Sequence, residues 1–264
     1  MLDLSHVCKT FNLGTINEKK ALVDLNLHLN PGDFVTVIGG NGAGKSTMLN
    51  AVAGVWPVDQ GAITINGQDV TGLPEFRRAA LIGRVFQDPM MGTAPNMQIV
   101  ENLALAYRRG QKRSLHWGVT RAEKSLYQEK LATLGLGLEN RMTSKVGLLS
   151  GGQRQALTLL MAALRKPKLL LLDEHTAALD PATAAKVLEL SDKIVQENNL
   201  TALMITHNMK DAIVHGNRLI MMNAGQIILD IRGEEKKKLT KADLLQKFAE
   251  VAGVQEETDS VLLS

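Results

Sequence analysis

Three short apolar runs along the chain set the predicted architecture. They span Phe34–Ile38, Lys168–Leu172 and Leu200–Thr206, and helical spacing of apolar residues follows each of them. Apolar runs of this length are typical of buried strands. Strands that alternate with helices build a largely parallel sheet, so the pattern predicts an α/β fold.

Antiparallel strands are predicted beside this sheet. Leu219–Asn223 and Gln226–Asp230 flank Ala224-Gly225, which is a hairpin pattern. The N-terminal stretch and Ala62–Asn66 add strand-like segments, and we expect them to form an antiparallel β subdomain.

Residues from about 88 to 148 carry helical patterns and no convincing strand. A capping box at Thr120–Glu123 opens a helix that we expect to run to about Leu134. We interpret this region as a helical subdomain inserted into the α/β core. It contains a basic cluster that forms either a solvated face or a patch facing a lipid or a partner, namely Arg108, Arg109, Lys112 and Arg113.

The predicted domains are one large domain over residues 1–232 and a tail over 233–264. The tail begins with the charged stretch Glu234–Lys238, which we interpret as a linker. Apolar residues at helical spacing then predict a helix that packs on the core, through Leu244, Leu245, Phe248 and Val251.

Composition narrows the class of protein. The 264 residues are 45% hydrophobic and carry a net charge of +3, which suits a globular protein and does not call for a nucleic-acid partner. The lone cysteine, Cys8, cannot form an internal disulfide, which fits a reducing compartment. We expect neither a signal peptide nor a membrane span, so any link to a membrane would come through a partner.

The stretch Gly39–Ser46 matches the phosphate-binding pattern G-x-x-x-x-G-K-[ST], with a strand before it and a helix after it. Its glycines let backbone N–H groups approach phosphate oxygens, and the helix N-terminus favours the same anion. We expect Lys45 to reach the β- and γ-phosphates of a nucleotide and Ser46 to bind Mg²⁺. The predicted nucleotide-binding residues here are Gly39, Gly40, Asn41, Gly42, Ala43, Gly44, Lys45, Ser46 and Thr47.

An apolar strand ends in two neighbouring carboxylates, Asp173 and Glu174. Ligands of open α/β sheets lie at the carboxyl ends of strands, so both acids are predicted near the phosphate loop. Neighbouring strand residues leave the backbone in different directions. We therefore predict that Asp173 faces the metal and that Glu174 polarises the attacking water.

Leu149-Ser150-Gly151-Gly152-Gln153 distinguishes this chain from other phosphate-loop enzymes. With this signature the sequence resembles the ABC ATPase family over roughly residues 2–232. The resemblance implies a P-loop NTPase, RecA-like core with an antiparallel β subdomain and an inserted helical subdomain. It also implies a head-to-tail homodimer, in which ATP lies between one phosphate loop and the partner's Ser150, Gly151, Gly152 and Gln153.

Further family positions occur in the expected order. The resemblance gives Gln87 the place of the glutamine that meets Mg²⁺ and water, and Asp180 that of the loop crossing the dimer seam. His207 takes the place of the switch histidine that contacts the γ-phosphate. Phe11 takes that of the aromatic ring stacked on adenine, although a purely structural role for this ring stays open.

The resemblance implies the ATP-hydrolysing subunit of an ABC transporter. Gly40 and His175 stand where the family usually has proline, and Asp-Glu-His-Thr at 173–176 looks like one importer subgroup. Its members work with a separate permease and a lipoprotein-type binding protein, on the cytoplasmic face of the membrane, and some are thought to import aromatic amino acids such as tryptophan. Export or lipoprotein release, and a non-transport ABC function, remain as alternatives.

Overall fold

Two segments far apart in the sequence fold into one unit of the computed structural model. Met1–Arg78 and Leu200–Ser264 form this first unit, and Ala79–Asn199 form the second. The structure describes residues 1–111 and 118–252.

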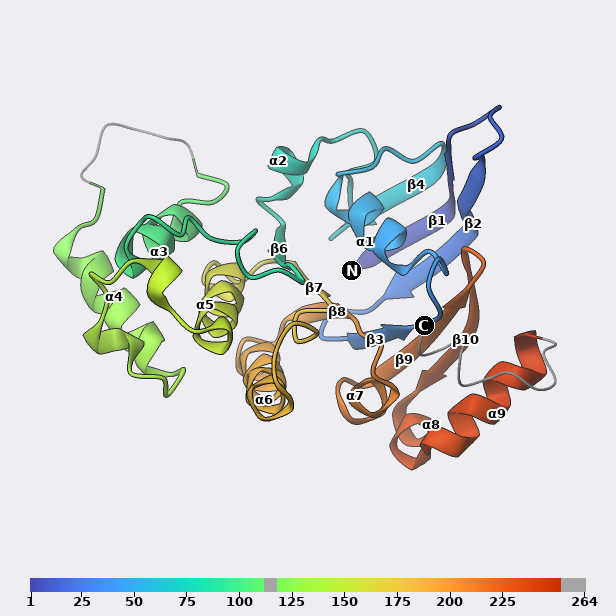
Figure 1. Cartoon of the computed structure of the whole chain (residues 1–264). Helices are drawn as coiled ribbons and strands as arrows, with labels where there is room; N and C mark the ends of the chain where they lie inside the picture. Colours follow the sequence, from blue (N-terminus) through green and yellow to red (C-terminus); the bar gives the residue numbers. More distant parts are fainter. Residues whose placement is uncertain (112–117, 253–264) are drawn as a thin grey trace. The chain divides into compact units, whose positions relative to one another are not determined.

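The first unit contains an antiparallel sheet in the order β2-β1-β4-β5 (Figure 1). Its strands are β1 (Leu2–Phe11), β2 (Lys19–Leu29), β4 (Gln60–Ile65) and β5 (Gln68–Asp69). Leu4 pairs with Leu27 on one side and with Ile63 on the other, and all three side chains are buried. The prediction of antiparallel strands at the N-terminus and at Ala62–Asn66 is confirmed.

The other strands of this unit are ordered β10-β9-β3-β8. They span β3 (Phe34–Ile38), β8 (Thr201–Ile205), β9 (Arg218–Asn223) and β10 (Gln226–Arg232). β3 is parallel to both of its neighbours, and every residue of β3 is buried, as a central parallel strand requires. β9 and β10 form the predicted antiparallel hairpin.

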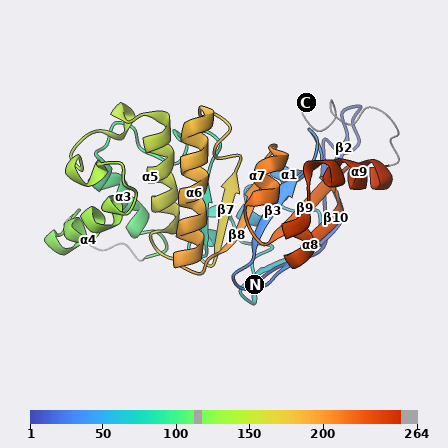
Figure 2. The same cartoon turned by 90° about the horizontal axis from the view of Figure 1, so that it is seen from below.

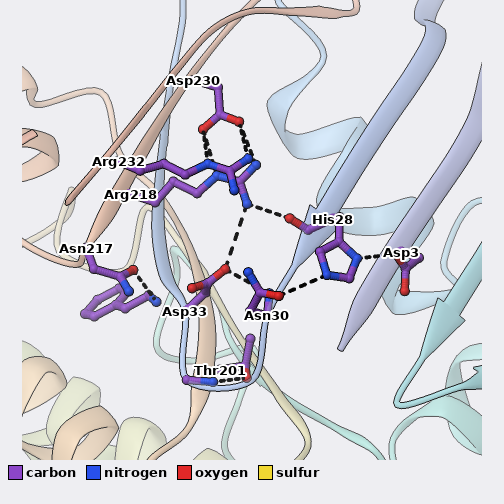
Figure 3. A network of polar contacts seen from close by, with 11 residues as sticks. Asp3, His28, Asn30, Asp33, Thr201, Asn217, Arg218, Asp230 and Arg232 are labelled. Atoms are coloured by element: carbon purple, nitrogen blue, oxygen red, sulfur yellow. Dashed lines mark hydrogen bonds and ion pairs between the residues drawn. The ribbon is translucent and has the colours of Figure 1, made fainter. Parts of the chain in front are cut away.

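A polar network joins several strand ends of the first unit (Figure 3). Arg218 is buried at the start of β9 and donates hydrogen bonds to the carboxylate of Asp230 and to the carbonyl oxygen of His28. Arg232 donates to the same carboxylate over 2.7 Å, and Asp33 lies 3.9 Å from Arg218. Through His28, at the end of β2, the network ties the antiparallel sheet to the β9–β10 hairpin.

Five helices complete the described part of this unit: α1 (Lys45–Ala53), α2 (Glu75–Arg78), α7 (Met209–Val214), α8 (Gly233–Lys238) and α9 (Lys241–Ala252). The linker interpretation of Glu234–Lys238 is wrong, because these residues form α8. Lys236 is buried, and its ammonium group donates to the carbonyl oxygens of His215 and Gly216 at the end of α7, which anchors the helix.

The predicted packing face of the tail is present on α9. Leu244 and Phe248 are buried with Ile38 and Met209 in one apolar cluster, and Leu245 is partly buried against it. The side chain of Val251 lies outside the described part of the structure. The tail therefore packs on the elements that carry the phosphate loop and α7.

The second unit holds two parallel strands and four α-helices among its described residues. They are β6 (Ile82–Val85), β7 (Leu169–Asp173), α3 (Ile99–Tyr107), α4 (Arg121–Ala132), α5 (Gly151–Ala163) and α6 (Pro181–Glu197), with short 3-10 turns η1 (Leu138–Asn140) and η2 (Val146–Leu148). In Figure 2, α5 and α6 lie side by side, in agreement with the contacts between them.

The helices α3, α4 and α5 enclose a common apolar core that includes Ile99, Leu103, Leu131 and Leu157. The predicted capping box is present, since Thr120 and Glu123 satisfy each other's backbone N–H groups at the start of α4.

The basic cluster is not simply a solvated face. Arg108 pairs with Glu123 over 2.9 Å, and Arg109 donates to the carbonyl oxygen of Ala162 over 2.8 Å. Lys112 and Arg113 lie outside the described residues. In the ranges 1–111 and 118–252, no helix combines the length and the apolar character needed to cross a bilayer.

Candidate functional site

The phosphate loop follows β3 and packs against the β9–β10 hairpin and β2. A β-carbon on Gly39 (φ 150°) would lie 2.2 Å from the carbonyl oxygen of Met222. One on Gly44 (φ 100°) would lie 2.5 Å from the carbonyl oxygen of Ala21. Both positions therefore require glycine for backbone approach as well as for conformation.

Lys45 points back into this loop. Its ammonium group donates to the carbonyl oxygens of Gly39 over 2.6 Å and Gly40 over 3.0 Å, and the residue is only 7% exposed. A charge held inside a ring of backbone groups is ready to meet an anion that enters the loop. Ser46 is exposed and Thr47 is half-buried in the first turn of α1, as a helix N-terminus that receives phosphate requires.

The remaining loop residues shape its turn. Asn41 and Gly42 are exposed, and the N–H of Ala43 donates to the carbonyl oxygen of Gly40 over 3.2 Å. The carbonyl oxygen of Ala43 in turn accepts from the N–H of Gly225 over 3.0 Å. The hairpin turn after β9 is therefore hydrogen-bonded to the phosphate loop and supports it.

His207 follows β8, the parallel neighbour of β3, and is exposed. Val37 pairs with Ile205, so the phosphate loop and His207 leave the same edge of this part of the sheet. Just beyond, in α7, burial raises the pKa of the Asp211 carboxyl, and the nearby charges of His215, Lys210 and His207 oppose the shift.

Phe11 ends β1 as a half-buried ring. The ring of Trp56 meets it edge-on, with the centroids 5.5 Å apart, and the Lys9 ammonium lies 5.6 Å from its centroid. Lys9 is held in turn by Asp59 over 2.8 Å. These contacts fix the ring and give it a structural role whether or not a base stacks on it.

Gln87 follows β6, and Asp173 is the last residue of the parallel strand β7, one residue beyond Leu172, which pairs with Val85 at the end of β6. Both residues therefore leave one edge of this strand pair. The carboxylate of Asp173 lies 3.3 Å from the guanidinium of Arg84, and both side chains are mostly buried. Arg84 did not emerge from the sequence reasoning, because its place beside Asp173 depends on the pairing of the two strands.

Glu174 is half-buried and has a left-handed backbone, with φ of 43°. Its carbonyl oxygen accepts from the N–H of Ala177 over 3.0 Å, which begins a tight turn after β7. This turn leads to α6, whose N-cap is Asp180. Hydrogen bonds from Thr183 lower the pKa of the Asp180 carboxyl, so the cap is ionised.

The signature residues form the start of α5. Ser150 is the N-cap, its hydroxyl accepts from the N–H of Gln153, and the Gln153 side chain returns the bond to Ser150. A β-carbon on Gly152 would lie 2.2 Å from Cγ2 of Thr183. The second signature glycine therefore lets α5 approach the start of α6.

The predicted site residues thus divide between the two units. The first unit carries the phosphate loop, Phe11 and His207, and the second carries Gln87, Asp173, Glu174, Asp180 and the signature. Sequence reasoning also missed Lys19 in the first unit. A β-carbon on Gly42 would lie 3.1 Å from the Lys19 ammonium group, which adds a second cation beside the phosphate loop.

The oxygen donors suit Mg²⁺ that is held mainly by phosphate. Mg²⁺ is bound through one or two protein oxygens plus substrate phosphates, whereas a protein cage would need several acids. The residues that the structure describes contain no cluster of three metal-binding side chains. In the first unit Ser46 is exposed at the start of α1, and its hydroxyl fits an ion that phosphate holds. In the second unit Asp173 offers a carboxylate beside Arg84, and an oxygen donor of this kind also suits Mg²⁺.

Comparison with known proteins gives the family. The profile of the ABC transporter family matches residues 22–177, more than half of the chain. The tyrosine transport ATP-binding protein of Clostridioides difficile is 43% identical, over 94% of this chain and 98% of that protein. A methionine import ATP-binding protein of Enterococcus faecalis is 34% identical, over 98% of this chain and 71% of that protein.

Solved structures agree with these relatives. A dimeric ATP-binding cassette bound to ADP and Pi is 30% identical, with a TM-score of 0.74 over 88% of this chain and 98% of that one. A cassette in its ADP conformation is 27% identical, with a TM-score of 0.76 over 94% of this chain. The predicted α/β cassette fold is confirmed. The chain belongs to the ABC transporter family, in which it is an ATP-hydrolysing subunit.

Proposed function

We propose that the chain binds the phosphates of ATP through its phosphate loop and hydrolyses ATP with Glu174 as the base, and that hydrolysis drives solute import. The phosphate loop carries this proposal. Its glycines are required by backbone approach, and its one lysine points inward at two carbonyl oxygens. Such a loop is built to receive a polyphosphate.

Each residue then has a role that follows from its chemistry. The N–H groups of residues 39–47 bind the phosphates, and the ammonium of Lys45 neutralises charge that develops on the γ-phosphate. Phe11 offers its ring to the adenine. His207 contacts the γ-phosphate from the edge that it shares with the loop.

In the chemical step, a water oxygen bonds to the γ-phosphorus as the bond from that phosphorus to the β–γ bridging oxygen breaks. The Glu174 carboxylate orients this water and accepts its proton, and ADP leaves with the bridging oxygen. Gln87 holds the water through its amide. Mg²⁺, when bound by Ser46, Asp173 and Gln87, would supply charge neutralisation at the β- and γ-phosphates.

The signature would complete the site of a second copy. Ser150, Gly151 and the N-terminus of α5 form another cradle of backbone N–H groups, and Asp180 lies at the start of the neighbouring helix. A helix N-terminus that presents such groups favours phosphate. The dimeric cassettes among the similar structures support a homodimer. We propose that its two copies meet head to tail, so that each signature faces the phosphate loop of the other copy.

For transport, we propose two copies bound to separate permease subunits, with the chain on the cytoplasmic face of the membrane and a lipoprotein-type binding protein outside. The names of the tyrosine and methionine relatives support import of an amino acid. The identity with the tyrosine relative over nearly all of both chains favours an aromatic one.

We place the permease contact at the Gln87 loop and the start of α3. Met91 is 69% exposed and Met90 is 39% exposed, which suits an inserted apolar helix. Met97 is half-buried just before α3 and suits the same surface. Ile99, the first residue of α3, is apolar too, but it is fully buried in the core of α3, α4 and α5 and does not line this surface. Met91→Glu should release the chain from detergent-solubilised permease, whereas a complex that survives this change would reject the contact.

The replacement Glu174→Gln tests the hydrolytic function. It should keep ATP affinity and lower the rate of phosphate release by about 10²–10⁴-fold, because the general base is lost while its shape remains. Steady-state phosphate release and binding of a fluorescent ATP analogue measure the two quantities. A rate within about threefold of the unmodified protein would remove Glu174 from the role of base.

A further inference from the structure

The backbone of Glu174 needs support from its surroundings. A left-handed φ is unfavourable for a residue other than glycine, because the β-carbon crowds the following carbonyl oxygen. Its φ of 43° therefore persists only because neighbouring contacts impose it. On its N-terminal side Glu174 is joined to the buried strand β7, and its carbonyl oxygen is held by the N–H of Ala177.

The next residue supplies a further anchor. His175 is 2% exposed, and its Nε2 lies 2.9 Å from the hydroxyl oxygen of Ser191, which is 1% exposed on α6. The Ser191 hydroxyl also lies 2.8 Å from the carbonyl oxygen of Val187. A carbonyl oxygen can only accept, so the hydroxyl proton is used there and the hydroxyl oxygen accepts from Nε2–H of His175.

This chain of bonds fixes the histidine. Nε2 carries a proton, and the ring is oriented by a partner on a long, well-packed helix. An apolar side chain of similar size would fill the same space without fixing an orientation. A proline here would instead push Glu174 toward an extended backbone, away from its φ of 43°.

We propose that His175 is a positioning residue for ATP hydrolysis: through Ser191 it holds the Glu174 backbone so that the carboxylate faces the attacking water. The proposal rests on the proposed role of Glu174 as the base. His175 itself does not touch the reacting atoms. A displacement of about 1 Å at a reacting group can cost about 10²-fold in rate, so a bond that fixes the adjacent residue has a measurable effect.

Three replacements test whether hydrolysis depends on the hydrogen bond between His175 and Ser191 or only on the volume of the His175 side chain. His175→Leu and Ser191→Ala each remove the bond, and each should lower kcat at least about tenfold while KM changes less than about twofold. His175→Gln keeps an N–H donor at the reach of Nε2, and it should retain kcat within about threefold. Steady-state phosphate release over a range of ATP concentrations gives both constants.

Ser125→Ala is the matched control for losing a helical serine, because the Ser125 hydroxyl also bonds a carbonyl oxygen four residues back, in α4. It should leave kcat unchanged. Binding of a fluorescent ATP analogue reports whether each variant is folded with an intact phosphate loop. If His175→Leu fails to bind the ATP analogue, the test rests on His175→Gln and Ser191→Ala. Their side chains differ little in volume from those of the parent residues, so they should not disturb the fold.

The double variant Glu174→Gln/His175→Leu tests whether His175 acts through Glu174. Its residual rate should equal that of Glu174→Gln alone, since a positioning residue has no effect once its target is removed. If Glu174→Gln is inactive but His175→Leu and Ser191→Ala keep normal kcat, the inference fails and the proposed function stands. If Glu174→Gln keeps normal activity, the proposed function fails first. Equal losses in His175→Gln and His175→Leu would also overturn the inference.

Discussion

Arg218 and Asp230 lie on neighbouring strands of the β9–β10 hairpin and form a two-bond ion pair, with both nitrogen–oxygen distances at 2.7 Å (Figure 3). Burial alone would raise the pKa of the Asp230 carboxyl. Hydrogen bonds from Arg218 and Arg232 outweigh burial and lower this pKa to about 2. The pair therefore stabilises the hairpin that supports the phosphate loop.

Replacing this carboxylate should destabilise the fold in a pH-dependent way. The folded pKa of Asp230 lies below the ordinary value of about 3.9, so its stabilisation is complete above pH of about 4 and is lost as pH falls toward 2. Asp230→Asn should lower the free energy of unfolding by about 1–2 kcal/mol at pH 7, less than the full shift implies, because the carboxylate is partly exposed and solvent screens the pair. Urea unfolding at pH 7 and at lower pH should show the difference between the two proteins shrinking as the pH falls.

Asp24→Asn is the control, because Asp24 pairs with His6 at an exposed position, where ion pairs contribute little. It should change the free energy of unfolding by less than about 0.5 kcal/mol. If Asp230→Asn is no more destabilising than this control at pH 7, the pair does not hold the hairpin.

The strands that flank the phosphate loop could be predicted because their apolar runs are continuous. β3 is buried along its whole length, and its sequence Phe34–Ile38 already contains that information. β2 was missed, although Leu25, Leu27 and Leu29 alternate with polar residues and are buried. The first half of β2, which starts at Lys19, does not alternate in this way. The apolar residues Leu13 and Ile16 just before it are exposed, so the apolar pattern does not mark where the strand begins.

Site residues could be predicted from the sequence where they form a contiguous motif. They could not be predicted where their role depends on a contact between residues far apart in the sequence. Gly39–Ser46 and Ser150–Gln153 are read from neighbouring residues. The contacts of Asp173 with Arg84, and of His175 with Ser191, join residues whose proximity follows from strand register and helix packing. A single sequence does not contain those distances.

Lys19 should contribute to nucleotide affinity through its place beside Gly42. Lys19→Ala should weaken ATP binding by about three- to tenfold, because a charged contact to phosphate is lost at an exposed position. The loss should shrink when the salt concentration is raised, as expected for an exposed charge. Titration with a fluorescent ATP analogue at two salt concentrations measures both effects.

Lys20 provides the matched comparison, since it is the next residue of β2 and its side chain leaves the opposite face of the sheet. Lys20→Ala should change ATP affinity by less than about twofold, and Lys19→Arg should retain it. Equal effects of Lys19→Ala and Lys20→Ala would mean that only the general positive charge matters.

Gly152 should be required by packing within one chain as well as by phosphate. A β-carbon there would lie 2.2 Å from Cγ2 of Thr183, so Gly152→Ala forces the start of α5 away from α6. Crowding of this kind costs about 1–3 kcal/mol. Gly151→Ala is the control, because its nearest neighbour would be the flexible end of Leu179 at 3.3 Å.

Thr183→Ser removes Cγ2 but keeps the hydroxyl, so the double variant Gly152→Ala/Thr183→Ser should recover most of the lost stability and part of the ATPase rate. Urea unfolding and phosphate release of the unmodified protein, Gly152→Ala, Thr183→Ser and the double variant give the coupling between the two sites. Stability that Thr183→Ser does not restore would show that the clash is not the cause. Restored stability without any restored hydrolysis would show that the loss of activity arises at the phosphate cradle and not from packing.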